Sequence, residues 1–135
     1  MEPMSSKPMN TVQKYIAAFN SGDADGMAAC FAPQGSILDG MAPHVWTGDT
    51  AARDWYRDVL IEGEHHGASG YKLELGETRR SDVNGDFSYL VISAELTFEL
   101  KSSPMATPGL FTLVLQKTGD THLIKAWAWA KGIQV

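Results

Sequence analysis

The side chains most often used for metal binding and nucleophilic chemistry are few in this sequence. The histidines are His44, His65, His66 and His122, and Cys30 is the only cysteine. The histidines lack the paired spacing along one helix or strand that a zinc or iron site usually needs, so we expect no metal. A single cysteine allows no intrachain disulfide. No Ser-His-Asp signature, glycine-rich phosphate loop or dinucleotide fingerprint is present, and we therefore expect no cofactor.

Tyr15 and Asp39 carry a phenol and a carboxylate that could move protons, but each has a simpler interpretation. Tyr15 lies on the apolar face of an expected helix, where an aromatic side chain usually packs in the core. Asp39 precedes Gly40, and an Asp-Gly pair is typical of a turn. Taken singly, neither residue indicates a functional site.

Length and composition indicate one globular domain. The chain has 135 residues, of which 44% are hydrophobic and 20% charged, as in proteins that bury a core. We expect a flexible arm over residues 1–9 and a single domain over residues 10–135. The net charge is −5 and the longest basic run is two arginines, so nucleic acid is not an expected partner. No stretch approaches the roughly 20 apolar residues of a membrane span, so we expect no membrane partner and a cytoplasmic location.

Helical periodicity predicts two helices at the start of the domain. The first begins with Asn10 or Thr11 as its N-cap and stops at Gly22, because its apolar residues recur at intervals of three and four. Asp23 is placed to cap a second, short helix that reaches Phe31 and is ended by the proline at position 33.

A short strand and a third helix are expected next. The strand covers Ser36 to Asp39, and the helix starts after Thr47 or Asp49 and runs to about Glu62. Residues 63–70 are rich in glycine and include two histidines, which indicates a loop that could act as a lid.

The second half of the chain changes to a period of two, the pattern of half-buried strands. Phe87 to Leu100, Leu110 to Lys117 and Leu123 to Ala130 are the clearest strands, and residues 102–109 are expected to form a loop. A turn with Gly119 and Asp120 joins the last two strands. Helices followed by a mostly antiparallel sheet predict an α+β fold rather than alternating βαβ units.

The spacing of several residues in the first half resembles that of ketosteroid isomerases. A tyrosine on the first helix is followed seven residues later by a Gly-Asp turn, then by an aspartate at a strand end and an aromatic-Tyr-Arg run. These residues are Tyr15, Gly22, Asp23, Phe31, Ala32, Asp39, Gly48, Trp55, Tyr56 and Arg57. The resemblance implies the NTF2-like (cystatin-like) cone, in which three N-terminal helices pack on a curved, mostly antiparallel sheet around one apolar pocket.

The resemblance also implies roles for individual residues. Asp39 would be the general base that moves a proton between carbons, and Tyr15 would donate a hydrogen bond to the enolate oxygen. Such a base needs a pocket dry enough to raise its basicity while leaving it ionised, and a phenol is a useful donor because its proton is acidic and fixed on a stiff ring. Tyr56 would orient Tyr15, with Phe19 and Trp55 as pocket wall.

The last strand carries two tryptophans that point to one side. Trp127 and Trp129 alternate with alanines 126, 128 and 130. Either the tryptophans line the pocket, or the alanines make room for a ligand while the tryptophans pack at a dimer surface. The resemblance favours Trp129 as pocket wall, because the family often has an aromatic residue near the end of this strand.

One departure from ketosteroid isomerases affects the expected reaction. Those enzymes place a second, protonated acid on a strand facing the tyrosine, but residues 110–115 here read Leu-Phe-Thr-Leu-Val-Leu. Thr112 could supply a weaker hydroxyl donor, although loss of one oxyanion donor typically costs about 100-fold to 1000-fold in rate. We therefore expect an isomerase or a SnoaL-like cyclase that acts by proton transfer on another small, hydrophobic carbonyl compound.

A non-catalytic interpretation competes with this enzyme. The fold also suits an NTF2-like module that binds an apolar ligand or assembles with another protein through its sheet, since fold does not fix function. In both cases the resemblance implies a homodimer formed through the outer face of the sheet.

Overall fold

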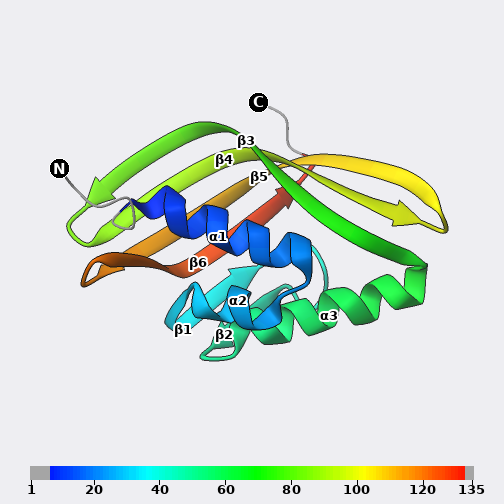
Figure 1. Cartoon of the computed structure of the whole chain (residues 1–135), viewed down its shortest axis with the longest axis horizontal. Helices are drawn as coiled ribbons and strands as arrows, with labels where there is room; N and C mark the ends of the chain where they lie inside the picture. Colours follow the sequence, from blue (N-terminus) through cyan, green and yellow to red (C-terminus); the bar gives the residue numbers. More distant parts are fainter. Residues whose placement is uncertain (1–6, 133–135) are drawn as a thin grey trace.

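The computed structural model describes residues 7–132 of the chain. Helices dominate the first half and long strands the second, as Figure 1 shows. The helices are α1 (Pro8–Ser21), α2 (Ala24–Ala29) and α3 (Ala51–His66). The strands are β1 (Phe31–Leu38), β2 (Val45–Gly48), β3 (Ala68–Asn84), β4 (Phe87–Leu100), β5 (Ser103–Thr118) and β6 (Thr121–Lys131).

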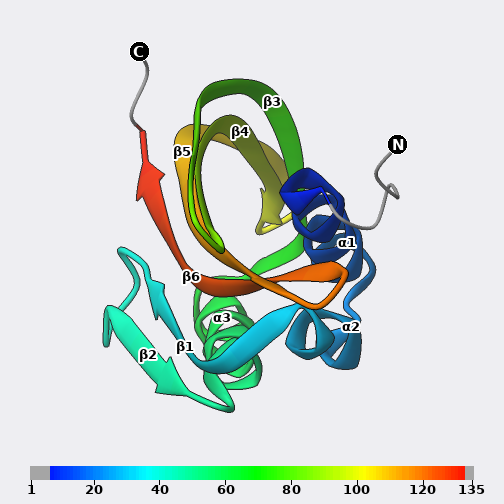
Figure 2. The same ribbon diagram turned by 90° about the vertical axis from the view of Figure 1, so that its left-hand side faces the viewer.

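The strands of residues 7–132 form one sheet in the order β2-β1-β6-β5-β4-β3. Neighbours pair antiparallel, except β1 and β6, which are parallel. Figure 2 shows that the sheet is strongly bent, with α1 and α3 on its inner side. The predicted α+β class and the curved, mostly antiparallel sheet under the helices are confirmed.

The core lies between the helices and the inner face of the sheet. Val12, Ile16 and Phe19 are buried on one face of α1, and Leu90 and Ile92 are buried at alternate positions of β4. Burial of such a side chain stabilises the fold by about 1.5–3 kcal/mol relative to leaving it in water. The predicted boundaries and alternation of β4 are confirmed.

Helix α1 begins earlier than the periodicity predicts. Lys7 is its N-cap and Pro8 its first residue, so neither predicted N-cap is used. Proline suits this position because the first helical N–H has no intrahelical partner. The predicted stop at Gly22 is confirmed, with φ at 72°. The expected arm of residues 1–9 is therefore wrong at positions 8 and 9, and residues 1–6 of it lie outside the described residues.

Helix α2 is capped as predicted but ends sooner. The Asp23 carboxylate accepts a hydrogen bond from the backbone N–H of Gly26 at 2.9 Å. Phe31, expected in this helix, instead opens β1, which begins five residues before the predicted strand. The cause is tertiary, because the backbone N–H of Ile124 in β6 binds the carbonyl of Cys30 at 2.7 Å and draws the chain into the sheet.

Helix α3 is shifted towards the C-terminus relative to the prediction. Its N-cap is Thr50 rather than Thr47 or Asp49, because β2, which the sequence pattern did not indicate, occupies the residues up to Gly48. β2 is a four-residue edge strand that pairs with β1 alone. The predicted end of α3 near Glu62 is also wrong, since this helix continues for another turn to His66.

Two expected loops are regular structure. Residues 63–66 are the last turn of α3 and residues 68–70 open β3, so the predicted lid is absent there. Gly63 lies inside this last turn. The position requires a glycine because a Cβ there would stand 2.8 Å from the Tyr71 hydroxyl oxygen. Residues 103–109, the other expected loop, belong to β5.

Gly109 on β5 allows the indole of Trp129 to lie close against the strand. A Cβ at this position would stand 2.6 Å from two ring carbons of Trp129 and 2.7 Å from the carbonyl oxygen of Ala130. The Ala130 carbonyl oxygen belongs to the adjacent strand and cannot move without disturbing the β5–β6 pairing, and the Trp129 ring would have to leave its place against Gly109.

We expect Gly109→Ala to lower the free energy of unfolding by about 1–3 kcal/mol, the usual cost of overpacking a closely packed site. Urea unfolding followed by tryptophan fluorescence measures this change. Gly40→Ala is the matched control, because a Cβ there meets nothing within 4 Å, and a change within about 0.5 kcal/mol is expected. Equal effects of the two variants would contradict the proposed contact.

Candidate functional site

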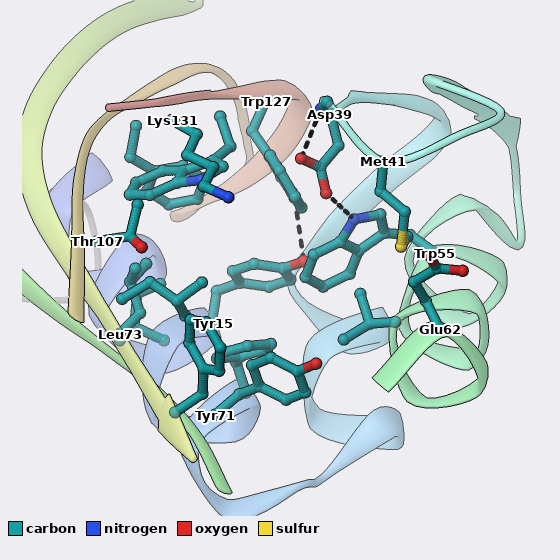
Figure 3. A pocket seen from close by; sticks show the side chains of 18 of the residues that line it. Tyr15, Asp39, Met41, Trp55, Glu62, Tyr71, Leu73, Thr107, Trp127 and Lys131 are labelled. Carbon is teal, nitrogen blue, oxygen red and sulfur yellow. Dashed lines mark hydrogen bonds between the residues drawn. The ribbon is translucent and has the colours of Figure 1, made fainter. Parts of the chain in front are cut away.

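A pocket of about 490 Å³ opens between the helices and the inner face of the sheet. This volume falls within the range of small-molecule sites. Its wall is mostly apolar and aromatic, with contributions from Ile16, Phe19, Met41, Trp55, Val59, Leu73, Leu96, Phe98, Phe111, Trp127 and Trp129. A few polar side chains also line it, namely Tyr15, Asp39, Glu62, Tyr71, Thr107 and Lys131 (Figure 3). An apolar cavity with few polar groups is the usual form of a site for a small organic ligand.

Asp39 lies at the end of β1, where the chain leaves the sheet and turns. Its Oδ2 accepts a hydrogen bond of 2.9 Å from the indole Nε1 of Trp55, and its Oδ1 accepts one of 2.7 Å from the backbone N–H of Gly40. Asp39 therefore begins a turn, as the Asp-Gly pair indicates, and it also lines the pocket. The two donors fix the orientation of the carboxylate.

Tyr15 is brought to the pocket by the buried face of α1. Its hydroxyl oxygen accepts a hydrogen bond of 3.0 Å from the indole Nε1 of Trp127 in β6 (Figure 3). Among residues 7–132 the Tyr15 hydroxyl donates no hydrogen bond. Its proton is therefore available to an acceptor in the pocket, and the indole bond to its oxygen makes it a stronger donor.

Electrostatics keep the Tyr15 hydroxyl protonated. Burial raises the pKa of Tyr15 far above its ordinary value of about 10. The hydrogen bond from Trp127 acts in the opposite direction, and the negative charge of Asp39 adds a smaller increase. Tyr15 is thus a neutral hydrogen-bond donor over the whole ordinary pH range.

The predicted pocket residues divide into two groups. Phe19, Trp55 and Trp129 line the pocket with Tyr15 and Asp39. Tyr56 does not.

The expected role of Tyr56 is corrected by its position behind Phe19. The two rings pack edge to face with centroids 6.1 Å apart, and Tyr56 lines a separate groove between the end of α1, α3 and the start of β3. Trp127 orients Tyr15 in its place.

Thr112 does not supply the missing second donor. It alternates along β5 with the buried Phe111 and Leu113, and it pairs with Ala128, so its side chain lies on the outer face of the sheet. The alternation that was recognised on β4 applies to β5 as well and places odd-numbered residues inward.

The last strand resolves the two alternatives for its tryptophans. Trp127 and Trp129 both line the pocket, and the alanines face outward. The same alternation continues beyond the predicted end of the strand at Ala130 and puts Lys131 on the pocket side. Thr107 was missed because its segment was expected to be a loop.

Within residues 7–132, no group of three or more histidine, cysteine, aspartate or glutamate side chains is placed to hold a metal ion. In the same part of the chain, no helix is long and apolar enough to cross a membrane.

Comparison with protein families and solved structures gives a consistent result. Residues 9–128 match the profile of the SnoaL-like domain. A ketosteroid isomerase-like protein from Erwinia carotovora atroseptica superposes with a TM-score of 0.76 at 14% identity, covering 99% of this chain and 100% of that one. A protein of unknown function with a cystatin-like fold from Nostoc punctiforme has a TM-score of 0.70 at 12% identity, covering 91% of this chain and 86% of that one.

A further similar structure comes from Thiobacillus denitrificans and is assigned as a calcium/calmodulin-dependent protein kinase type II association domain. Its TM-score is 0.75 at 19% identity, and the match covers 98% of this chain and 100% of that one. At such identities the similarity shows a shared fold, and it does not transfer the activities of these proteins to this chain.

We expect the burial of Tyr15 to appear in the pH dependence of stability. Unfolded Tyr15 ionises near pH 10 while the folded side chain keeps its proton, so the folded state loses up to about 1.4 kcal/mol per pH unit above pH 10. The Tyr15→Phe variant does not show this loss of stability at high pH, because phenylalanine has no hydroxyl to ionise. At neutral pH the variant is less stable by about 1–3 kcal/mol, because the buried Trp127 N–H loses its acceptor.

Thermal unfolding of the two proteins between pH 8 and 11 measures the effect. The stability gap between wild type and Tyr15→Phe should be constant up to about pH 9.5 and then narrow. Tyr71, whose pKa burial also raises, is present in both proteins and cancels in the comparison. A gap that stays constant to pH 11 would show that Tyr15 ionises freely in the folded state.

Proposed function

The chain belongs to the SnoaL-like domain family of the NTF2-like superfamily, and on this premise we propose that it is a cofactor-independent isomerase or cyclase. The proposed substrate is a small, hydrophobic, enolisable carbonyl compound held in the pocket. Asp39 is the general base and Tyr15 the hydrogen-bond donor. The observation that carries the proposal is that both side chains reach one apolar pocket, each held by the N–H of a tryptophan indole.

The proposed reaction begins with proton abstraction. The Asp39 carboxylate takes a proton from the carbon beside the carbonyl group, and the electron pair of the broken C–H bond forms the C=C bond of an enolate. The Tyr15 hydroxyl donates a hydrogen bond to the enolate oxygen, where negative charge develops. Protonated Asp39 then returns the proton to another carbon, which completes an isomerisation and restores the carboxylate.

Cyclisation uses the same two groups. The enolate carbon attacks a second carbonyl group of the same molecule and forms a C–C bond, and the new alkoxide takes the proton from Asp39. Holding both reacting parts in one pocket supplies the orientation that such a step requires.

The environment of Asp39 supports its role as a base. Its two hydrogen-bond donors leave lone pairs free on both oxygens, so the carboxylate can accept a proton without first breaking a bond. The aromatic neighbours of Trp55, which include Trp127 at a ring distance of 4.8 Å, hold the indole that orients it.

Phe19 and Trp129 are proposed to bind the substrate as apolar wall residues, together with Trp55. The proposed location is the cytoplasm, which is compatible with the single, buried Cys30.

A homodimer through the outer face of the sheet is proposed as part of this assignment. No helix among residues 7–132 covers that face, and Phe87 and Tyr89 on it are 44% and 40% exposed. Val114 lies at its centre, paired with Tyr89 on one side and Ala126 on the other. The association-domain assignment of the Thiobacillus denitrificans structure supports assembly through this fold. Assembly without catalysis is the second candidate function.

We expect Asp39→Asn to lower turnover by about 100-fold to 10,000-fold, the usual contribution of a general base. The assay is the isomerisation of a panel of β,γ-unsaturated ketones to their conjugated isomers, followed by absorbance, with deuterium uptake at the acidic carbon followed by NMR. Ligand affinity should remain nearly unchanged, because asparagine keeps the shape of the side chain.

Asp120→Asn in the β5–β6 turn is the control, since this exposed carboxylate lies outside the pocket wall. Equal turnover of Asp39→Asn and wild type would overturn the assignment of the base. A wild-type protein that binds these ketones but neither isomerises nor exchanges them favours the non-catalytic function.

We expect Val114→Glu to convert the dimer to a monomer, because buried like charges would face each other across the two-fold axis. Light scattering coupled to size-exclusion chromatography measures the mass. Val83→Glu is the control. Val83 is 72% exposed near the end of the β3–β4 hairpin, and its pairing with Ser88 places it on the inner face of the sheet, away from the proposed dimer interface. A wild-type protein of 14.7 kDa in solution would contradict the proposed dimer.

A further inference from the structure

The pocket wall carries polar side chains that the proposed proton transfer does not use. Lys131 and Thr107 line the pocket at the end of the sheet, on β6 and β5 (Figure 3). In this view the ammonium group of Lys131 and the hydroxyl of Thr107 lie on one side of the cavity, and Glu62 lies across from them.

The strand register fixes these two side chains beside each other. Lys131 is paired with Gly109, and Thr107 lies two residues from Gly109 on the same face of β5. They are therefore diagonal neighbours, whose side chains lie within reach of one ligand group. The space over Gly109, beside both residues, is occupied by the indole ring of Trp129, which gives the subsite an apolar floor.

Lys131 supplies the only positive charge in the pocket wall formed by residues 7–132. It forms no ion pair within that part of the chain. Of the acidic side chains in the wall, Glu62 contacts His66 at 2.8 Å and Asp39 is held by Trp55. The stem of a lysine covers apolar surface well, but a neutral ligand would gain little from its ammonium group.

We propose that Lys131 and Thr107 form a subsite for a carboxylate group on the ligand. The ammonium and hydroxyl groups would donate to the two carboxylate oxygens, while the apolar part of the ligand lies against the aromatic wall. This subsite, together with Tyr15 and Asp39, would then fix the orientation of the ligand.

This inference refines the proposed function, on which its catalytic consequence rests. It defines the substrate class as enolisable carbonyl compounds that also carry a carboxylate. With the carboxylate at Lys131, the carbonyl group is directed towards Tyr15 and the adjacent carbon towards Asp39.

The test compares two ligands of the same shape, 2-naphthylacetate and its neutral amide, 2-naphthylacetamide. Isothermal titration calorimetry at pH 7 and low salt should show that the acid binds about tenfold more tightly than the amide, as expected for one partly exposed ion pair. Lys131→Gln should bind both ligands equally, and Lys131→Arg should keep the preference. Added salt should reduce the preference in wild type.

Lys117→Gln is the matched control, because it removes an exposed lysine of β5 that does not line the pocket. Equal binding of acid and amide by wild type overturns the subsite, as does a preference that survives in Lys131→Gln. Failure of the acid to bind at millimolar concentration overturns it as well.

The binding test is independent of the proposed chemistry. Asp39→Asn should retain the preference for the acid, even though it loses turnover. If the wild-type protein isomerises ketones but binds acid and amide equally, the subsite alone is rejected. If the wild-type protein prefers the acid but transfers no proton, the catalytic proposal alone is rejected.

Discussion

The hydrogen bond between the Trp127 indole and the Tyr15 hydroxyl connects the first helix to the last strand across 112 positions of the chain. A buried indole N–H or phenol without a partner costs about 1–3 kcal/mol, so each group requires the other. The bond fixes how α1 lies on the sheet, and it determines which atom of Tyr15 faces the pocket. Because the oxygen accepts from Trp127, its proton remains for a ligand.

Asp39 also depends on hydrogen-bond partners for its place in the pocket wall. Asp39 can remain in a largely apolar wall because the Trp55 indole and the Gly40 amide donate to it. The indoles thus have two functions, since their rings form the apolar wall and their N–H groups orient the acid and the phenol. The rings of Trp55 and Trp127 meet edge to face at 4.8 Å, which couples the two orientations.

The pocket exists because the bent sheet and the helices do not close completely over each other. Gly109 lets Trp129 lie close to the sheet, and the two large tryptophan rings of β6 line the cavity without filling it. An unfilled apolar cavity is a cost to stability, since its lining loses packing contacts. The few polar groups in its otherwise apolar wall are those expected of a site built for a ligand.

The sequence by itself determined the elements with strong local signals. The apolar period of α1, the Asp23 cap, Gly22 and the alternation over β4 follow from local backbone and side-chain preferences, and the spacing of Tyr15 and Asp39 indicated the family. Only the tertiary structure decided the extent of β1, because its pairing with the distant β6 overrides weak local preferences there, and β2 exists through its pairing with β1. It also replaced Tyr56 by Trp127 as the partner of Tyr15, moved Thr112 outside and brought Lys131 and Thr107 together, since the strand register sets which side chains meet and no local pattern encodes it.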